Sequence, residues 1–247
     1  MSKPIFIAHR GYAAAYPENS LLALQAAKNV GAEYVEVDIQ LSKDHVPVLF
    51  HDRDLNRLCQ QNGAIHNYTF SELENFMLTD SEKFSNLYVD NKITSLQSFV
   101  EFLKENPNLK AFIELKRSMI TIFGEDLVLE KVLPMFENME KQISFISYNQ
   151  NILKTIHNTT SFDIGVVVDQ WSEYKVEKNN QPQWLFCSVE GLTSGNDEIK
   201  KLQSNSTKIA VFEVGNIGVA KHLFAKGINY LETFRIKEML ENFNGEK

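Results

Sequence analysis

Short apolar runs alternate with amphipathic segments along most of this 247-residue chain. The alternation predicts an α/β protein, because parallel strands need crossover helices to connect them. We expect strands at Ile5–Ala8, Tyr34–Ile39, Val46–Phe50, Ala111–Leu115, Ile143–Ser147, Ile164–Val168, Trp184–Val189, Ile209–Val214 and Ile228–Glu232. We expect helices at Ser20–Val30, Ser71–Met77, Leu96–Glu105, Asp126–Lys141, Gln150–His157, Ile217–Ala225 and Ile236–Phe243.

Nine candidate strands are one more than a (β/α)8 TIM barrel contains, in a chain close to the length of about 250 residues typical of that fold. The second and third candidates are separated only by residues 40–45, which are too few for a crossover helix and have the composition of a turn. These two runs are therefore expected to form a hairpin. If the hairpin turns at Lys43 and Asp44, the numbers of paired residues sum to about 87, and His51 lies opposite Glu36.

The strand and helix pattern weakens between Asp52 and Thr94, where polar residues surround one short helical piece. Such a stretch is long for a connection within a compact domain. We therefore expect residues 1–247 to form a single barrel domain with an insertion at 55–93, in the position of a lid.

The chain carries 25 basic and 32 acidic residues, a net charge of −7, which argues against nucleic acid or an anionic membrane as partner. The two cysteines, Cys59 and Cys187, have no metal-binding or redox spacing. No secretory leader and no membrane-spanning stretch is recognisable. These features predict a soluble, cytoplasmic protein, and they do not set its oligomeric state.

Histidine and arginine occur together at the end of the first expected strand, in His9-Arg10-Gly11. Such a pair can transfer a proton and neutralise an oxyanion at the same place. Gly11 lets the backbone turn without a Cβ, and the later Pro17-Glu18-Asn19-Ser20 contains the start signals of a helix.

Carboxylates alternate with apolar residues on two expected strands. Glu36 and Asp38 project to one face, and Glu114 and Lys116 repeat the arrangement further along the chain. Confined carboxylates need a cation, a proton or an arginine, and their hard oxygens suit Ca²⁺, Mg²⁺ or Mn²⁺. Taken singly, solvated acids on an exposed face and a salt bridge between Lys116 and Glu114 explain the same pattern.

A second histidine, in His51-Asp52, follows another apolar run. Functional groups gather at the carboxyl ends of strands in a TIM barrel. One such histidine is usually structural, but two at strand ends suit paired proton transfer, since an ordinary pKa of about 6.5 permits either role near neutral pH.

The ordered set His-Arg-Gly with Pro-Glu-Asn-Ser, then Glu-x-Asp, His-Asp and Glu-x-Lys resembles the glycerophosphodiester phosphodiesterase family. The resemblance implies a TIM barrel with a small insertion after the second histidine, and a divalent cation, Ca²⁺ or Mg²⁺ with Mn²⁺ as a further option. It implies the following roles: metal ligands Glu36, Asp38 and Glu114; acid and base His9 and His51; phosphate binding by Arg10 and Lys116; and supporting contacts by Glu18 and Asn19.

Three positions depart from the family pattern. Ser20 stands where threonine is commoner, Phe212 stands where tryptophan is frequent, and Phe234 stands where aspartate often follows the threonine. Phe212 is expected to line the substrate site, so this change bears on substrate preference more than on catalysis.

The implied reaction is metal-dependent hydrolysis of glycerophosphodiesters to sn-glycerol 3-phosphate and an alcohol, within lipid and glycerol metabolism. Neither the nucleophile, water or a substrate hydroxyl, nor the identity of the base follows from the residues. One alternative is a barrel resembling phospholipase D or phosphatidylinositol lyases that releases a cyclic phosphate. Another is a non-catalytic barrel that binds phosphodiesters.

Overall fold

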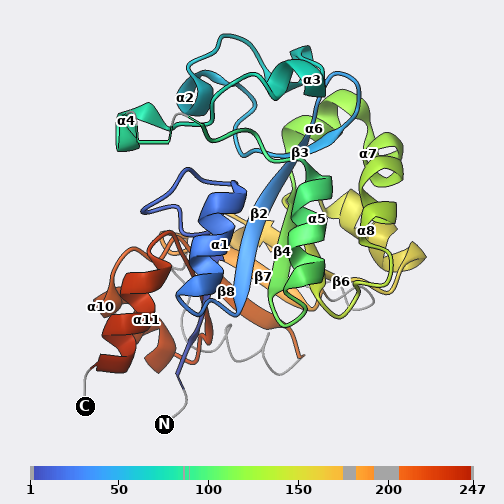
Figure 1. Ribbon diagram of the computed structural model, residues 1–247. Helices are drawn as coiled ribbons and strands as arrows, with labels where there is room; N and C mark the ends of the chain where they lie inside the picture. Colours follow the sequence, from blue (N-terminus) through green and yellow to red (C-terminus); the bar gives the residue numbers. More distant parts are fainter. Residues whose placement is uncertain (1–2, 86, 89, 175–181, 192–205, 246–247) are drawn as a thin grey trace.

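The computed structural model describes residues 3–85, 87–88, 90–174, 182–191 and 206–245. Within this part of the chain, eight parallel strands close into a barrel, because β1 pairs with both β2 and β9 (Figure 1). The expected (β/α)8 TIM barrel is therefore confirmed. The barrel strands are β1 (Ile5–His9), β2 (Tyr34–Leu41), β4 (Lys110–Leu115), β5 (Ile143–Ser147), β6 (Asp163–Val168), β7 (Trp184–Ser188), β8 (Lys208–Phe212) and β9 (Tyr230–Thr233).

The ninth strand, β3 (Pro47–Leu49), runs antiparallel to β2, so the expected hairpin is confirmed. Its register is one residue away from the expected one. Ile39 pairs with Leu49, so that paired numbers sum to 88. Continued along the chain, this register places Val37 rather than Glu36 opposite His51, and the expected His51–Glu36 pairing is wrong. One residue of shift in a turn is enough to change every partner.

Helices cover the outside of the barrel between successive strands (Figure 1). They are α1 (Leu21–Asn29), α5 (Leu96–Glu105), α6 (Arg117–Phe123), α7 (Glu125–Val132), α8 (Gln150–Thr159), α10 (Ile217–Ala225) and α11 (Ile236–Gly245), with the 3-10 turns η2 (Leu133–Phe136) and η3 (Trp171–Glu173). The expected helix over 126–141 is too long, because α7 ends at Val132 and a 3-10 turn with Pro134 in its first positions follows. Helix α6 was not expected from the sequence, and Gly124, with φ of 79°, separates it from α7.

The strands bury two apolar layers. On β2, Val35, Val37 and Ile39 face the helices, within the larger core cluster. Inside the barrel, apolar side chains of several strands form a second cluster: Ile7, Phe112, Ile146, Val167, Trp184, Phe186 and Ala210. Side chains alternate between these two layers, so Glu36 and Asp38 point into the barrel. Polar groups thus occupy the interior beyond the apolar layer.

The segment between β3 and α5 contains α2 (Asn56–Cys59), η1 (Ile65–Asn67), α3 (Phe70–Leu73) and α4 (Ser81–Phe84). A small core of its own includes Leu58, Ile65 and Leu73, which pack against Val48 and Phe50. Figure 1 shows the segment beyond one end of the barrel, next to β3. The helix expected at 71–77 is a single turn, α3, which Thr69 and Glu72 cap reciprocally.

The described residues contain no helix with both the length and the apolar character needed to cross a bilayer.

The loop that follows β1 lies directly against the first turns of α1. Gly11 has a φ of 82°, and a Cβ there would lie 2.7 Å from the carbonyl carbon of Ala23. The Tyr12 backbone N–H donates to the Ala23 carbonyl at 2.9 Å, and the Ser20 hydroxyl accepts from the Ala23 N–H at 3.1 Å. Glycine is required here both for the left-handed backbone and for the close approach.

A comparison of Gly11→Ala with Gly31→Ala tests this requirement. Gly31 has a similar φ of 96°, but a Cβ there would have no atom within 4 Å. Both variants acquire the left-handed strain of about 1–2 kcal/mol. Gly11→Ala adds an overpacking cost of about 1–3 kcal/mol, so it should lower the free energy of unfolding in urea by that much more. Equal losses for the two variants would contradict the close approach.

Candidate active site

A cavity of about 100 Å³ opens at the carboxyl ends of the strands, where TIM barrels place functional groups. Seven of the predicted site residues line it: His9, Arg10, Glu36, His51, Glu114, Lys116 and Phe212. The other three, Glu18, Asn19 and Asp38, are buried and contact the lining residues. The structure thus brings together in space all ten residues singled out from the sequence.

Arg10 is held in a network of carboxylates. Its backbone has a φ of 56°, and its N–H donates to Glu36 Oε2 at 3.2 Å. Its guanidinium donates to Glu18 Oε1 at 2.9 Å and forms an ion pair with Asp38 Oδ2 at 3.1 Å. These contacts hold the Arg10 side chain in one conformation. They also explain why Glu18, eight positions further along the chain, belongs to the same site.

Asn19 connects the first loop to β2. Its amide Nδ2 donates to Asp38 Oδ2 at 2.9 Å, and its Oδ1 accepts from the Asp38 backbone N–H at 3.1 Å. Its own backbone N–H donates to the Arg10 carbonyl at 3.1 Å. Glu18 and Asn19 therefore position the loop that carries Arg10.

Three carboxylates from two neighbouring strands converge. Glu36, Asp38 and Glu114 each offer an oxygen, and these oxygens lie within 4.8 Å of one another. Lys116 Nζ contacts Asp38 Oδ1 at 3.1 Å and Glu114 Oε1 at 2.8 Å, so the salt bridge weighed from the sequence is present. Among the described residues, Glu36 Oε1 has no hydrogen-bond partner although it is buried.

The carboxylates differ in their titration because their surroundings differ. Burial and the neighbouring Asp38, Glu232 and Glu114 raise the pKa of Glu36 well above its ordinary value. Burial would also raise the pKa of Asp38, but Lys116 and Arg10 outweigh it and hold that pKa below the usual range. Glu36 is thus a carboxyl group that a cation or a proton must neutralise.

The two histidines occupy different environments. Burial, followed by the charge of Arg10, lowers the pKa of His9 well below its ordinary value. The His9 ring stacks on Phe234 with centroids 4.4 Å apart and planes at 8°, which fixes its orientation. His51 is partly exposed, and its Nδ1 lies 2.7 Å from Asp52 Oδ1. A carboxylate at Nδ1 favours the tautomer that leaves Nε2 as the acceptor.

Sequence reasoning missed several residues of this site. Glu232 on β9 lines the cavity and is 2% exposed. Its alternation with the interior-facing Tyr230 was a usable signal, but one carboxylate at a strand end carries little weight alone. Phe234 was noted only as a departure, and its contact with His9 is visible only in three dimensions. Gln40 donates to the carbonyls of His51 and Asp52 at 3.3 and 3.2 Å.

Arg57, from α2, was also missed, and it joins the two ends of the site. Its guanidinium donates to both oxygens of Glu18, at 2.7 and 3.1 Å, and to both oxygens of Asp52, at 2.7 and 3.0 Å. Glu18 in turn binds Arg10, and Asp52 binds His51. The segment after β3 therefore supplies a clamp between the two motifs.

The replacement Arg57→Gln should lower stability in a pH-dependent way. Burial alone would raise the pKa of Glu18 and of Asp52. Hydrogen bonds outweigh burial and lower both pKa values: Arg57 donates to Glu18, and His51 and Arg57 bind Asp52. The stabilisation is therefore present above their unfolded pKa near 4 and lost as the pH falls through the lower folded values. We expect the free energy of unfolding to fall by about 1–2 kcal/mol at pH 7. This value is in the lower part of the range for charged hydrogen bonds because the Arg57 side chain is 37% exposed.

Urea unfolding at pH 7 and at pH 3 measures this difference, which should shrink at the lower pH. Arg53→Gln, an exposed position in the same segment, is the control and should be close to wild type at both values. A loss that does not change with pH would contradict the clamp.

Comparison with known proteins extends the description. The model of the glycerophosphoryl diester phosphodiesterase family matches residues 9–228. A Bacillus altitudinis glycerophosphodiester phosphodiesterase is 24% identical over 237 residues, which are 92% of each chain. Another, from Caldanaerobacter subterraneus, is 29% identical over 154 residues, 62% of each chain.

The fold is shared with solved structures as well. That of an Oleispira antarctica phosphodiesterase in complex with the product sn-glycerol-3-phosphate has a TM-score of 0.85 and 21% identity, and the match covers 98% of both chains. The family match includes every motif that lines the cavity. This chain therefore belongs to the glycerophosphoryl diester phosphodiesterase family and to that class of enzymes.

Proposed function

We propose that residues 1–247 act as one enzyme domain that hydrolyses glycerophosphodiesters to sn-glycerol 3-phosphate and a small alcohol, with one divalent cation and the histidine pair His9 and His51. Family membership supports the reaction class. The observation that carries the mechanism is the charge imbalance of the cavity, which an anionic substrate cannot enter unaided.

Seven groups set that charge: the carboxylates Glu36, Asp38, Glu114, Glu213 and Glu232 and the cations Arg10 and Lys116. If all are ionised, five negative charges against two positive leave a formal excess of three negative charges. A phosphodiester is itself an anion, so this excess repels it. One divalent cation offsets most of this excess and relieves the repulsion among the carboxylates.

The donors present fit such an ion. Glu36, Asp38 and Glu114 would hold it, and the unpartnered Oε1 of Glu36 supports this assignment. An all-oxygen set suits Ca²⁺ or Mg²⁺, with Mn²⁺ also accommodated. When bound, the ion supplies Lewis-acid neutralisation of charge on the phosphodiester oxygens.

Arg10 and Lys116 would bind the phosphodiester. Lys116 Nζ is shared between Asp38 and Glu114, two of the assigned metal ligands. Once those carboxylates are neutralised, its ammonium can turn to a phosphate oxygen. Arg10 keeps its contact with Glu18 and presents a fixed cation at the same cavity. Both stabilise the charge that builds on the phosphate in the transition state.

His9 and His51 would divide the proton transfers. One accepts the proton of the attacking oxygen, from water or a substrate hydroxyl, while the other protonates the departing alkoxide. The neutral form of His9, favoured by its burial, and the Nε2 acceptor of His51, favoured by Asp52, support this use. Phe212 and Tyr148 line the same cavity and would contact the glycerol or the head group.

The products would belong to lipid and glycerol metabolism. The two free, buried cysteines, Cys59 and Cys187, agree with the expected cytoplasmic location, which stays a prediction.

The direct test is incubation of the purified protein with glycerophosphocholine and Ca²⁺ or Mg²⁺, followed by assay of sn-glycerol 3-phosphate and choline. Release of both supports the proposal. A cyclic phosphate as final product would instead favour the lyase-type alternative. Binding of the diester without turnover, under either ion, would favour the non-catalytic barrel.

The metal assignment predicts that Glu36→Gln, Asp38→Asn and Glu114→Gln each abolish metal-dependent turnover, because each removes one charged donor of the same ion. Turnover with and without a chelator, together with circular dichroism for the fold, measures this. Glu101→Gln, an exposed position on α5, is the matched charge control and should keep wild-type activity. Wild-type rates for all three variants in chelator-treated buffer would overturn the metal mechanism.

The acid/base assignment predicts that His9→Ala and His51→Ala each lower kcat by about 10² to 10⁴-fold. His222→Ala, at an exposed position on α10, should have no effect. A nitrophenyl ester identifies the acid, since its leaving group needs no protonation. The variant that lacks the acid should regain most of its rate on this substrate, and the variant that lacks the base should not. If neither variant recovers, the paired mechanism is wrong.

A further inference from the structure

We propose that His9, Glu36 and Glu232 form a second cation position, which shares Glu36 with that of Glu36, Asp38 and Glu114 and takes a transition-metal dication such as Zn²⁺. The proposed function gives Glu232 no role beyond its contribution to the charge of the cavity, so this site lies beyond it. The inference rests on the placement of these three side chains, on their unpartnered atoms and on the chemistry of the donors.

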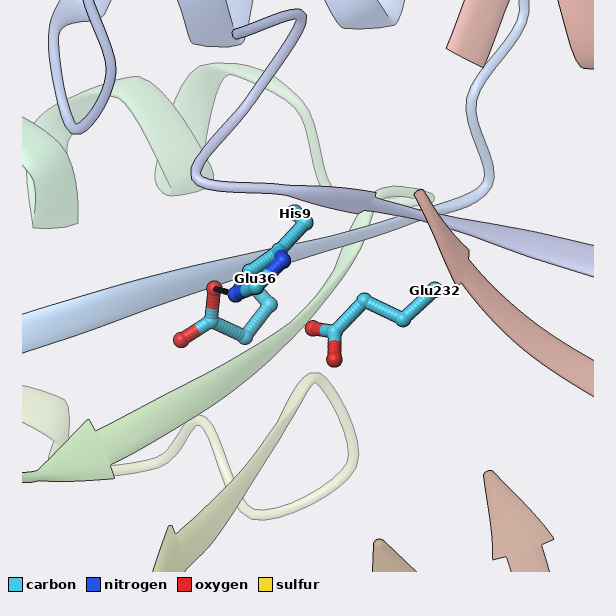
Figure 2. Close-up of side chains that lie close together, drawn as sticks. All are labelled: His9, Glu36 and Glu232. Atoms are coloured by element: carbon cyan, nitrogen blue, oxygen red, sulfur yellow. Dashed lines mark ion pairs between the residues drawn. The ribbon is translucent and has the colours of Figure 1, made fainter. Parts of the chain in front are cut away.

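Three adjacent strands bring the side chains together. β1 lies between β9 and β2, with Ile7 paired to Glu232 and His9 paired to Glu36. Figure 2 shows the imidazole of His9 beside the carboxylate of Glu36, with the carboxylate of Glu232 extending toward both from β9. His9 Nε2 lies 3.6 Å from Glu36 Oε2, and one donor atom of each residue lies within 4.8 Å of the other two. This spacing can accommodate a single ion.

The donors are buried and lack partners. His9, Glu36 and Glu232 are 6%, 1% and 2% exposed. Among the described residues, His9 Nδ1, Glu36 Oε1 and Glu232 Oε1 have no hydrogen-bond partner. A buried polar atom without a partner costs about 1–3 kcal/mol, so each of these three residues favours a ligand.

The side chains of the two cations at the site pair with other carboxylates. Lys116 Nζ contacts Asp38 and Glu114, at 3.1 and 2.8 Å. The Arg10 guanidinium contacts Glu18 and Asp38, and only the Arg10 backbone N–H reaches Glu36. Glu36 and Glu232 are therefore the carboxylates that form no ion pair with a lysine or arginine side chain among the described residues.

The donor set distinguishes this position from the first. Glu36, Asp38 and Glu114 offer only oxygen, whereas His9 adds an imidazole nitrogen, which Zn²⁺ accepts far more readily than Ca²⁺ or Mg²⁺ does. Phe234 stacks on the His9 ring at 4.4 Å and holds it in one plane. The nitrogen donor is thus preorganised, and a large excess of Mg²⁺ should not displace Zn²⁺ from it.

One consequence rests on the proposed function. If His9 transfers a proton during the reaction, Zn²⁺ bound to its imidazole takes the lone pair that this role needs. Zn²⁺ should then inhibit the Mg²⁺-supported reaction, and Glu232→Gln should relieve the inhibition. If the proposed function is wrong, Zn²⁺ need not inhibit any reaction, but the second cation position can still exist.

The test is the amount of Zn²⁺ bound to chelator-treated protein after dialysis against Zn²⁺ with Mg²⁺ in large excess, measured by elemental analysis. The wild type should bind one Zn²⁺ per chain more than Glu232→Gln, or bind it on the order of tenfold or more tightly. Glu213→Gln removes a carboxylate from the lining of the same cavity that is not one of the three donors, and it should retain the additional Zn²⁺ that Glu232→Gln loses.

A second measurement needs no variant and guards against a folding defect in Glu232→Gln. X-ray absorption of the Zn²⁺-loaded wild type in excess Mg²⁺ should detect an imidazole nitrogen among the ligands. Equal Zn²⁺ binding by wild type and folded Glu232→Gln, or a ligand set of oxygen alone, would overturn the second position. Neither result depends on whether the protein hydrolyses a glycerophosphodiester.

Discussion

The ion pairs that bury Asp38 are the interaction on which the site depends. Asp38 is fully buried at the centre of β2 and contacts the guanidinium of Arg10 and the ammonium of Lys116. Asn19 adds hydrogen bonds to both its side chain and its backbone. A buried carboxylate without such partners would cost several kcal/mol. These contacts bring the ends of β1 and β4 and the loop before α1 to one place.

The same arrangement leaves part of the cavity charged. Arg10 and Lys116 form ion pairs with Asp38, and Lys116 also pairs with Glu114, whereas Glu36 and Glu232 form no ion pair with a lysine or arginine among the described residues. The fold tolerates this because β-sheet hydrogen bonds and two apolar layers hold the strands in register regardless. The proposed need for a cation before an anionic substrate binds rests on that asymmetry.

Much of the barrel could be predicted because its signals are local. Apolar runs, their spacing and the turn between β2 and β3 are properties of neighbouring residues. The errors also have local causes. The hairpin register shifted by one residue, and Pro134 shortened the helix expected over 126–141. The candidate site residues were found because their types recur at strand ends, where a TIM barrel brings side chains together.

The sequence alone determined which residue types stand at the carboxyl ends of which strands, since alternation and strand position are written in the order of the chain. Only the tertiary structure decided which of them meet. Arg57 reaches Glu18 across 39 positions, Phe234 stacks on His9, and Glu232 joins Glu36 because β9 and β2 flank the same strand. Closure of the barrel creates these contacts, and no local pattern can encode the closure of a sheet between its first and last strands.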